Sequence, residues 1–251
     1  MSASPPRVVA VVQARTGSTR LPGKVLRPLA GMPLLYHVVD RLRRAERLDA
    51  VAVATTHEEG DRAIRTFGET YGVPVYEGPT DDVLARYTGA AERFGADVVV
   101  RVTGDCPLVD PATVDRAVDR LLAAGGSLDC VNVGVGGGFP LGLDCEVVTR
   151  GALLRAQALA NSPAEREHVT VLILRRRDRF RVEDLEAPPE LFGPRWRLCV
   201  DELADFEFMS AIYTRLYRTG SIVDVRDVLA LLARDAGLAS INAGVRQKQA
   251  L

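Results

Sequence analysis

The 251-residue chain has few cysteines, no long hydrophobic run and no excess of charge of either sign. Its four cysteines are scattered without Cys-x-x-Cys pairs, which argues against a zinc site and against a disulfide framework. No apolar stretch approaches the roughly 18–20 residues that a bilayer-spanning helix needs. The 32 basic and 33 acidic residues give a net charge of −1, which favours neither nucleic acid nor an anionic membrane as a partner. We therefore expect a reduced, cytoplasmic protein without a membrane or nucleic-acid partner.

What the chain does have is a regular alternation of apolar runs and amphipathic segments. Continuous apolar runs separated by helices are typical of a largely parallel sheet that is covered on both faces. Ligands of such sheets bind beyond the carboxyl ends of the strands, so the residues just after each strand matter most. The pattern predicts strands at 8–12, 51–55, 73–76, 98–102, 143–147 and 196–200, and helices at 33–42, 61–71, 84–94, 111–124, 165–177, 202–219 and 223–236.

The loop after the first predicted strand, residues 13–24, brings three cations and two glycines into one short segment. A strand-end loop with free backbone N–H groups and converging Arg and Lys side chains is suited to a polyphosphate. The same residues are also compatible with a basic surface loop that follows an edge strand. We favour the phosphate-binding interpretation because a Gly-Ser pair stands among the cations directly after a buried strand.

This loop matches neither of the two common nucleotide-binding motifs. A Walker A loop has four residues between its glycines and a hydroxyl residue after its lysine. Here five residues separate Gly17 from Gly23, and Val25 follows the lysine. A dinucleotide-binding fingerprint needs three glycines at fixed spacing, and the stretch 134–138 has Phe139 where the third should stand. Both motifs are therefore excluded.

Two carboxylates follow predicted strands. Asp105 comes shortly after the strand at 98–102, and Asp201 directly follows the strand at 196–200. Mg²⁺ prefers one or two carboxylates together with phosphate oxygens and water. The alternative for each aspartate is that it caps the helix that comes after it. A magnesium site is the prediction if the two side chains meet in space.

These residues together resemble the CMP-sugar synthetase superfamily, the cytidylyltransferases that act on 3-deoxy-manno-octulosonate and on acylneuraminates. The resemblance is carried by residues 15–24, 103–108 and 200–201, and it covers nearly the whole chain. Within the superfamily it is nearest to the spore coat polysaccharide biosynthesis cytidylyltransferase-like group. That narrower match rests on the segments 81–87, 142–146, 165–170 and 241–248.

The resemblance implies a three-layer α/β/α fold of the nucleotide-diphospho-sugar transferase type, which is Rossmann-like and has a mostly parallel mixed sheet. It implies a single cytidylyltransferase domain over residues 1–251 that forms a homodimer. The nucleotide-binding core is expected at about 7–125 and 195–251. The segment of about 126–194 is expected to bind the acceptor and to form the dimer interface.

The activity that the resemblance implies is Mg²⁺-dependent transfer of CMP from CTP to a hydroxyl or acid group of a small-molecule acceptor, with release of pyrophosphate. Catalysis of this kind is mostly positioning and charge neutralisation. By the same resemblance the catalytic residues are Lys24, Arg15 and Asp105, and the metal ligands are Asp105 and Asp201. The nucleotide-binding residues are Ala14, Arg15, Gly17, Ser18, Arg20, Lys24, Thr55 and Gly104.

The middle of the chain supplies the candidate acceptor-binding residues. Asp144 and Glu146 are two apart, so their side chains point the same way if both lie on a strand. Arg166 and His168 are candidates for binding a carboxylate or phosphate group of the acceptor. The alternatives are a solvated strand face for the first pair and an ordinary charged helix opening for the second. The acceptor itself stays open among keto-sugar acids, phosphonates and other alcohols.

Two other functions remain compatible with these residues. A glycosyltransferase of the same architecture usually carries an Asp-x-Asp motif after a strand, and the segment 104–106 does not supply one. A non-catalytic nucleotide-binding scaffold is disfavoured by the presence of the full set of charged residues. The preference for cytosine over other bases rests on the resemblance alone.

Overall fold

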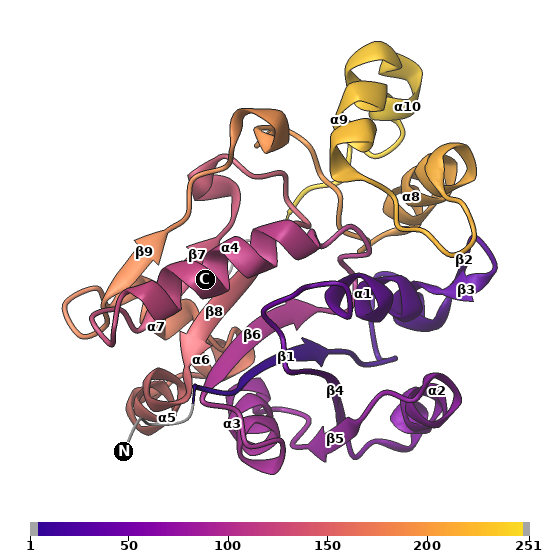
Figure 1. The fold of residues 1–251 in the computed structure, drawn as a ribbon. Helices are drawn as coiled ribbons and strands as arrows, with labels where there is room; N and C mark the ends of the chain where they lie inside the picture. The colour runs from indigo at the N-terminus through magenta and orange to yellow at the C-terminus, as the bar shows by residue number, and fades with distance from the viewer. Residues whose placement is uncertain (1–4, 248–251) are drawn as a thin grey trace.

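The computed structural model describes residues 5–247 and shows a seven-stranded sheet between two layers of helices (Figure 1). The strand order is β5-β4-β1-β6-β8-β7-β9, and a separate two-stranded hairpin joins β2 to β3. The strands are β1 (Val8–Gln13), β2 (Pro28–Leu29), β3 (Met32–Pro33), β4 (Ala50–Thr56), β5 (Val75–Gly78), β6 (Val98–Thr103), β7 (Cys130–Val133), β8 (Cys145–Thr149) and β9 (Val182–Asp184). The helices are α1 (Leu34–Leu42), α2 (Arg62–Tyr71), α3 (Val83–Arg93), α4 (Pro111–Ala123), α5 (Arg150–Leu159), α6 (Pro163–Glu167), α7 (Val171–Arg175), α8 (Leu203–Leu216), α9 (Val225–Arg234) and α10 (Ala236–Ser240).

The direction of the strands brings the loops of interest to one edge of the sheet. β1, β4, β5 and β6 are parallel to one another. β8 runs antiparallel to both β6 and β7, and β9 is parallel to β7, so β7 and β9 point the same way as β6. The loops 14–24 after β1, 104–110 after β6 and 134–144 between β7 and β8 therefore all lie at one edge. The prediction of a mostly parallel, three-layer α/β fold is confirmed.

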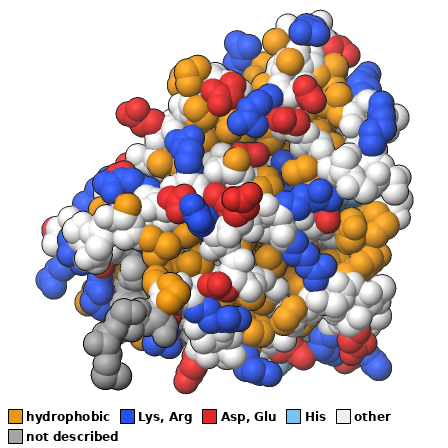
Figure 2. All heavy atoms as spheres, in the orientation of Figure 1, with side chains coloured by type: hydrophobic (Ala, Val, Ile, Leu, Met, Phe, Trp, Pro, Cys, Tyr) orange, Lys and Arg blue, Asp and Glu red, His pale blue; other side chains and the backbone are white. Residues whose placement is uncertain are grey.

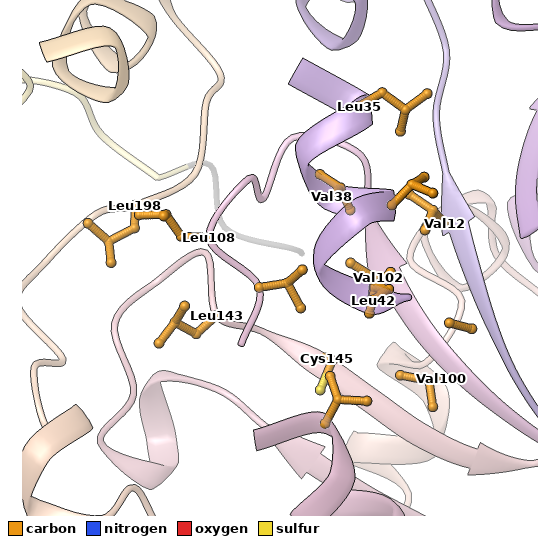
Figure 3. Packing of buried hydrophobic residues seen from close by; sticks show 14 of the residues in the cluster. Val12, Leu35, Val38, Leu42, Val100, Val102, Leu108, Leu143, Cys145 and Leu198 are labelled. Atoms are coloured by element: carbon orange, nitrogen blue, oxygen red, sulfur yellow. The ribbon is translucent and has the colours of Figure 1, made fainter. Parts of the chain in front are cut away.

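Different helices cover the two faces of the sheet. Successive residues of a strand point to opposite faces, so each strand contributes to both cores. Val8, Ala10 and Val12 of β1 belong to a large core cluster with apolar residues of α1, α4 and α8. Val9 and Val11 belong to a second cluster with α3, α5 and α7. Figure 3 shows part of the larger cluster, where side chains of α1 and of the sheet meet residues from the loops at the carboxyl edge. These loops are thus anchored in the core.

The surface carries charges of both signs. Figure 2 shows Lys and Arg side chains intermixed with Asp and Glu side chains over one face of the molecule, with apolar side chains between them. This mixture agrees with the near-zero net charge of −1. Among the helices of residues 5–247, none is long and apolar enough to cross a membrane.

The segment 196–200 is not a strand, so the prediction from its apolar pattern is wrong. It forms only an isolated bridge between Arg197 and Leu141. The N–H of Leu198 donates to the carbonyl of Leu141, and the N–H of Val200 donates to the carbonyl of Asp105. The backbone of this segment therefore binds two loops of the carboxyl edge and does not extend the sheet.

The helix predicted at 165–177 is also wrong, because the chain forms two short helices there, α6 and α7. Val169 lies between them with a φ of 49°, a left-handed conformation that interrupts the helix. β5 and β8 begin two residues later than predicted, at Val75 and Cys145. β7 and β9 are short strands that the apolar pattern did not reveal.

Candidate functional site

Three loops of the carboxyl edge meet at the side chain of Lys24. The Nζ atom of Lys24 lies 2.5 Å from Oδ2 of Asp105 and 2.8 Å from Oδ1 of Asp201. Only 11% of the Lys24 side chain is exposed. Burial opposes the charge of this ammonium, yet the two carboxylates outweigh it and raise the pKa of Lys24 above its usual value. The two aspartates whose juxtaposition the sequence left open therefore do meet, with a buried cation between them.

Asp201 is the most heavily paired carboxylate of this cluster. Besides Lys24, it accepts Arg20 Nη2 at 2.8 Å and Arg197 Nη2 at 2.6 Å. Burial opposes ionisation of Asp201, but Lys24 and the two arginines lower its pKa below the usual value. A second guanidinium nitrogen of Arg20, Nη1, is buried and has no hydrogen-bond partner among residues 5–247, and it lies 3.7 Å from Oε1 of Glu202 in a longer ion pair. Arg20 therefore links Asp201 and Glu202, with a hydrogen-bonding capacity that the described residues do not fill.

Arg197 is a site residue that the sequence analysis missed, because the apolar pattern placed it inside a strand. Its Nε atom donates to Oδ1 of Asp205 at 2.9 Å, and Asp205 is fully buried. Asp205 also accepts the backbone N–H of Asp201 at 3.0 Å. Asn242 donates to Asp205 at 3.0 Å and to the carbonyl of Arg197 at 3.1 Å. This network fixes Asp201, and it gives the segment 241–248 a role, although Lys248 lies outside the described residues.

Asp105 is held by the residues around it. The hydroxyl of Thr103 donates to Oδ1 of Asp105 at 2.6 Å, while Oδ2 faces Lys24. Asp105 does not cap α4, because Asp110 accepts the N–H of Thr113 in that role. Gly104 is needed here, since a Cβ at this position would lie 3.0 Å from the carbonyl oxygen of Gln13. The loop after β6 can therefore pack directly against the loop after β1.

The loop after β1 leaves several backbone donors free. The N–H groups of Gly17, Thr19 and Arg20 form no hydrogen bond within the part of the chain that the structure describes. Ser18 stabilises the turn, because its hydroxyl accepts the N–H of Leu21 at 3.4 Å. Arg15 is exposed and makes no ion pair with any described residue. This combination of free N–H groups and an unpaired guanidinium is what an anion-binding loop requires.

Asp61 shapes this loop and was not predicted as a site residue. It is 2% exposed, and its Oδ1 accepts both the N–H and the hydroxyl of Thr16, at 2.6 and 2.8 Å. Its Oδ2 accepts the hydroxyl of Thr56 at 2.5 Å. Burial raises the pKa of Asp61, but these hydrogen bonds lower it by more, so the pKa lies below its usual value. The sequence signal for this role was weak, because an aspartate at this position is also what the start of a helix such as α2 commonly has.

Replacing Asp61 with alanine is expected to destabilise the fold by about 1–3 kcal/mol, because buried donors of Thr16 and Thr56 lose their acceptor. Chemical denaturation measures the change. Asp115→Ala is a useful control, because Asp115 accepts two backbone N–H groups at an exposed position far along the chain from this loop. An unchanged midpoint for Asp61→Ala would show that the loop keeps its shape without this carboxylate.

Two other predicted nucleotide-binding residues lie inside the structure. Ala14 is 5% exposed, and its N–H donates to the carbonyl of Ala54 at 3.1 Å. Thr55 is fully buried near the end of β4, and its hydroxyl is among the groups that lower the pKa of Asp61. Both side chains are therefore part of the buried packing beside the loop after β1.

The predicted acceptor-binding pair Asp144 and Glu146 lies at the same edge of the sheet. Glu146 is on β8 and forms an ion pair with Arg101 of β6, at 2.8 Å. Asp144 precedes β8 and accepts the N–H of Gly142 at 2.6 Å. The expectation that both lie on one strand is wrong, because the strand starts at Cys145.

The other predicted acceptor residues lie on a separate element. Arg166 of α6 pairs with Asp82 at 2.6 Å, and Asp82 caps the start of α3. His168 is the residue at which α6 ends. The structure thus gives Arg166 a contact that joins two helices, and it shows no hydrogen bond or ion pair between these two residues and Asp144 or Glu146.

Asp105 and Asp201 are the candidate ligands for a divalent metal. In the described chain, no group of three or more His, Cys, Asp and Glu side chains is arranged to hold a metal ion. The two carboxylates nevertheless converge on one cation, the ammonium of Lys24. Two carboxylates completed by phosphate oxygens and water form a ligand set that Mg²⁺ prefers. The residues present fit a magnesium ion that arrives with a phosphate ligand.

Comparison with known sequences gives matches over most of the chain. A family model described as cytidylyltransferase matches residues 9–168. The chain is 36% identical over 244 residues to an uncharacterized protein of Methanocaldococcus jannaschii, covering 96% of this chain and 97% of that protein. It is 33% identical over 240 residues to the spore coat polysaccharide biosynthesis protein SpsF of Bacillus subtilis, covering 93% and 97%.

A partial relative and a solved structure extend this comparison. The 3-deoxy-manno-octulosonate cytidylyltransferase of Geobacter sulfurreducens is 39% identical over 116 residues, which is 45% of each chain. The structure of a cytidylyltransferase from Leptospira borgpetersenii superposes with a TM-score of 0.87 at 27% identity, over 97% of this chain and 100% of that one.

Proposed function

Because the chain belongs to the cytidylyltransferase family, we propose that it transfers CMP from CTP to a hydroxyl or acid group of a sugar-like acceptor and releases pyrophosphate. The observation that carries this proposal is the convergence of Lys24, Asp105 and Asp201 from three loops at the carboxyl edge of the sheet. Ligands of parallel sheets bind at this edge. The names of the cytidylyltransferase and spore coat polysaccharide relatives support CTP as the nucleotide and a sugar as the acceptor.

The triphosphate is proposed to bind the loop 14–24. The free N–H groups of Gly17, Thr19 and Arg20 would donate to phosphate oxygens. Arg15 is exposed and free to close over the nucleotide. These contacts fix the α-phosphorus for attack, which is the main source of catalysis in phosphoryl and nucleotidyl transfer.

Lys24 is proposed to stabilise the charge that develops as pyrophosphate leaves. Its ammonium is a compact point charge that stays protonated because two carboxylates raise its pKa. The residues that would hold Mg²⁺ are Asp105 and Asp201, and the ion would neutralise charge on the phosphate oxygens when bound. Arg197 keeps Asp201 in place through the buried carboxylate of Asp205.

The segment of about 126–194 is proposed to bind the acceptor and to form a homodimer interface. Asp144 lies in this segment on a loop at the same edge as Asp105, which supports the first part of the proposal. Glu146 is proposed to act through Arg101, and Arg166 with His168 would meet a more distant part of the acceptor.

Thermal stabilisation by CTP, UTP, ATP and GTP in the presence of Mg²⁺ tests the nucleotide assignment. A ligand at about a hundred times its dissociation constant stabilises the folded state by roughly 2.7 kcal/mol. We expect the unfolding midpoint to rise with CTP and to change little with the other three nucleotides. A rise with UTP or GTP alone would overturn the choice of base, and no rise with any nucleotide would count against the proposed activity.

A further inference from the structure

Asp144 is joined to the Lys24 cluster by a chain of backbone hydrogen bonds. The N–H of Leu198 donates to the carbonyl of Leu141 at 2.6 Å, and the N–H of Val200 donates to the carbonyl of Asp105 at 2.9 Å. The loop that carries Asp144 is therefore bound to the segment that leads into Asp201, and this segment is bound to Asp105. Figure 3 shows Leu108, Leu143 and Leu198, one from each of these loops, in the same core cluster.

The carboxylate of Asp144 differs from the other carboxylates of this region in its partners. Lys24 pairs with Asp105 and Asp201. Arg20 and Arg197 pair with Asp201, and Arg101 pairs with Glu146. Asp144 accepts one backbone N–H, that of Gly142 at 2.6 Å, and has no ion-pair partner among residues 5–247. Its other oxygen, Oδ1, faces Gly134, where an added Cβ would lie only 3.3 Å away. A side chain at position 134 would crowd this oxygen, so the glycine leaves room beside the half-buried carboxylate.

We propose that Asp144 is the base that removes the proton from the acceptor, and that the acceptor therefore attacks through an alcohol hydroxyl. This inference rests on the cytidyl transfer proposed above. The O–H bond of the acceptor breaks and its proton goes to a carboxylate oxygen of Asp144. The acceptor oxygen forms a bond to the α-phosphorus of CTP, the bond from that phosphorus to the bridging oxygen breaks, and pyrophosphate leaves with the electron pair.

The chemistry of the surroundings favours a neutral hydroxyl over an ionised nucleophile. A hydroxyl donates a hydrogen bond to the unpaired carboxylate, whereas a phosphonate or phosphate oxygen would meet it with like charge. Arg101 is engaged by Glu146 and so is not free to offset that repulsion. An ionised nucleophile also has no proton to lose, so its attack would not need Asp144 as a base.

The protonation behaviour of Asp144 agrees with this role. Burial and the neighbouring Glu146 raise the pKa of Asp144 to about 6, although the N–H of Gly142 and the charge of Arg101 act in the opposite direction. The thiols of Cys106 and Cys145 are also nearby, and burial raises the pKa of both, so they stay neutral. A base with a pKa near the working pH is an effective proton acceptor.

Asp144→Asn, Asp144→Glu and Asp119→Asn separate this role from a structural one. Asp119 is the control, because it lies outside the proposed acceptor-binding segment and forms a half-exposed ion pair with Arg47. Pyrophosphate release from CTP is measured with 3-deoxy-manno-octulosonate, ribitol, methylphosphonate or water as the acceptor, and CTP binding is measured separately by thermal shift. Ribitol offers only hydroxyls, 3-deoxy-manno-octulosonate offers hydroxyls and a carboxylate, and methylphosphonate offers an ionised phosphonate oxygen and no hydroxyl on carbon.

We expect the native protein to use a hydroxyl acceptor and not methylphosphonate, with a rate that rises with pH through about 6 as Asp144 loses its proton. Asp144→Asn should lower this rate about 10²–10⁴-fold, abolish the rise with pH and leave the CTP shift intact. Asp144→Glu should keep the rise, and Asp119→Asn should match the native protein.

Three results would overturn the proposal: a rate in Asp144→Asn within tenfold of native, efficient transfer to methylphosphonate, or release with none of the four acceptors although CTP binds. Loss of CTP binding in Asp144→Asn would also overturn it, since the residue would then serve the nucleotide. Failure of the native protein to bind CTP at all is a different outcome, and it refutes the cytidyl transfer on which this inference rests.

Discussion

Lys24→Ala is expected to lower the rate of pyrophosphate release from CTP by at least about 10²–10³-fold, the usual cost of removing one preorganised electrostatic contact. The ammonium is the only lysine charge within the described residues and lies 2.5 and 2.8 Å from two site carboxylates. Its removal takes a positive charge out of the proposed triphosphate site. Steady-state kinetics at saturating acceptor measure the loss, and circular dichroism checks that the fold is retained.

The same substitution is expected to lower stability when no metal is added, because Asp105 and Asp201 then face each other without the cation between them. Removing one partner of a buried pair typically costs about 3–5 kcal/mol. Addition of Mg²⁺ should restore part of this stability if the two carboxylates hold the ion. Arg47→Ala is a suitable control, because Arg47 forms an ion pair with Asp119 that is half exposed. Native turnover in Lys24→Ala would refute the assignment of this loop to the triphosphate.

The fold was largely predictable because its strands are continuous apolar runs and its loops carry specific motifs. Val8–Gln13 and Val98–Thr103 are buried on both faces, and such β-branched apolar runs are typical of the central strands of a parallel sheet. The family that the motifs suggested is confirmed by the sequence matches. Prediction was wrong at 196–200, where an apolar pattern serves packing against loops and not strand pairing. Apolar periodicity reports burial, and it does not report the partner of the backbone hydrogen bonds.

The supporting residues of the site could not be predicted for a related reason. Asp61 contacts Thr16 across 45 positions, and Arg197 acts through a carboxylate eight positions further along. Neither residue belongs to a pattern of spacing that marks a chemical role. Each acts by holding another residue in place, and such contacts are set by the tertiary fold. The assignment of roles to Lys24, Asp105 and Asp201 stays a prediction that the variants above test.

Gly142→Ala is expected to cause a large loss of stability. Gly142 has a φ of 102°, and a Cβ on it would lie 2.5 Å from the carbonyl carbon of Leu198 and from the backbone nitrogen of Cys199. Neither contact can be relieved by rotating a side chain, because both involve backbone atoms. Backbone strain and overpacking together cost roughly 2–6 kcal/mol. Thermal and chemical denaturation measure the change.

Gly220→Ala separates the clash from the backbone conformation alone. Gly220 has a φ of 83°, but a Cβ there would have no heavy atom within 4 Å, so we expect only the left-handed penalty of about 1–2 kcal/mol. Equal losses in the two variants would show that the loop around Gly142 yields without cost. If the loss is larger at Gly142, the loops must separate, because the alanine displaces Leu141 from Leu198 and moves Asp144 relative to Asp201. At temperatures where the Gly142→Ala variant is folded, its activity should still be lower than that of the native protein. The reason is that Gly142 fixes the position of the proposed base, Asp144, relative to the phosphate-binding cluster.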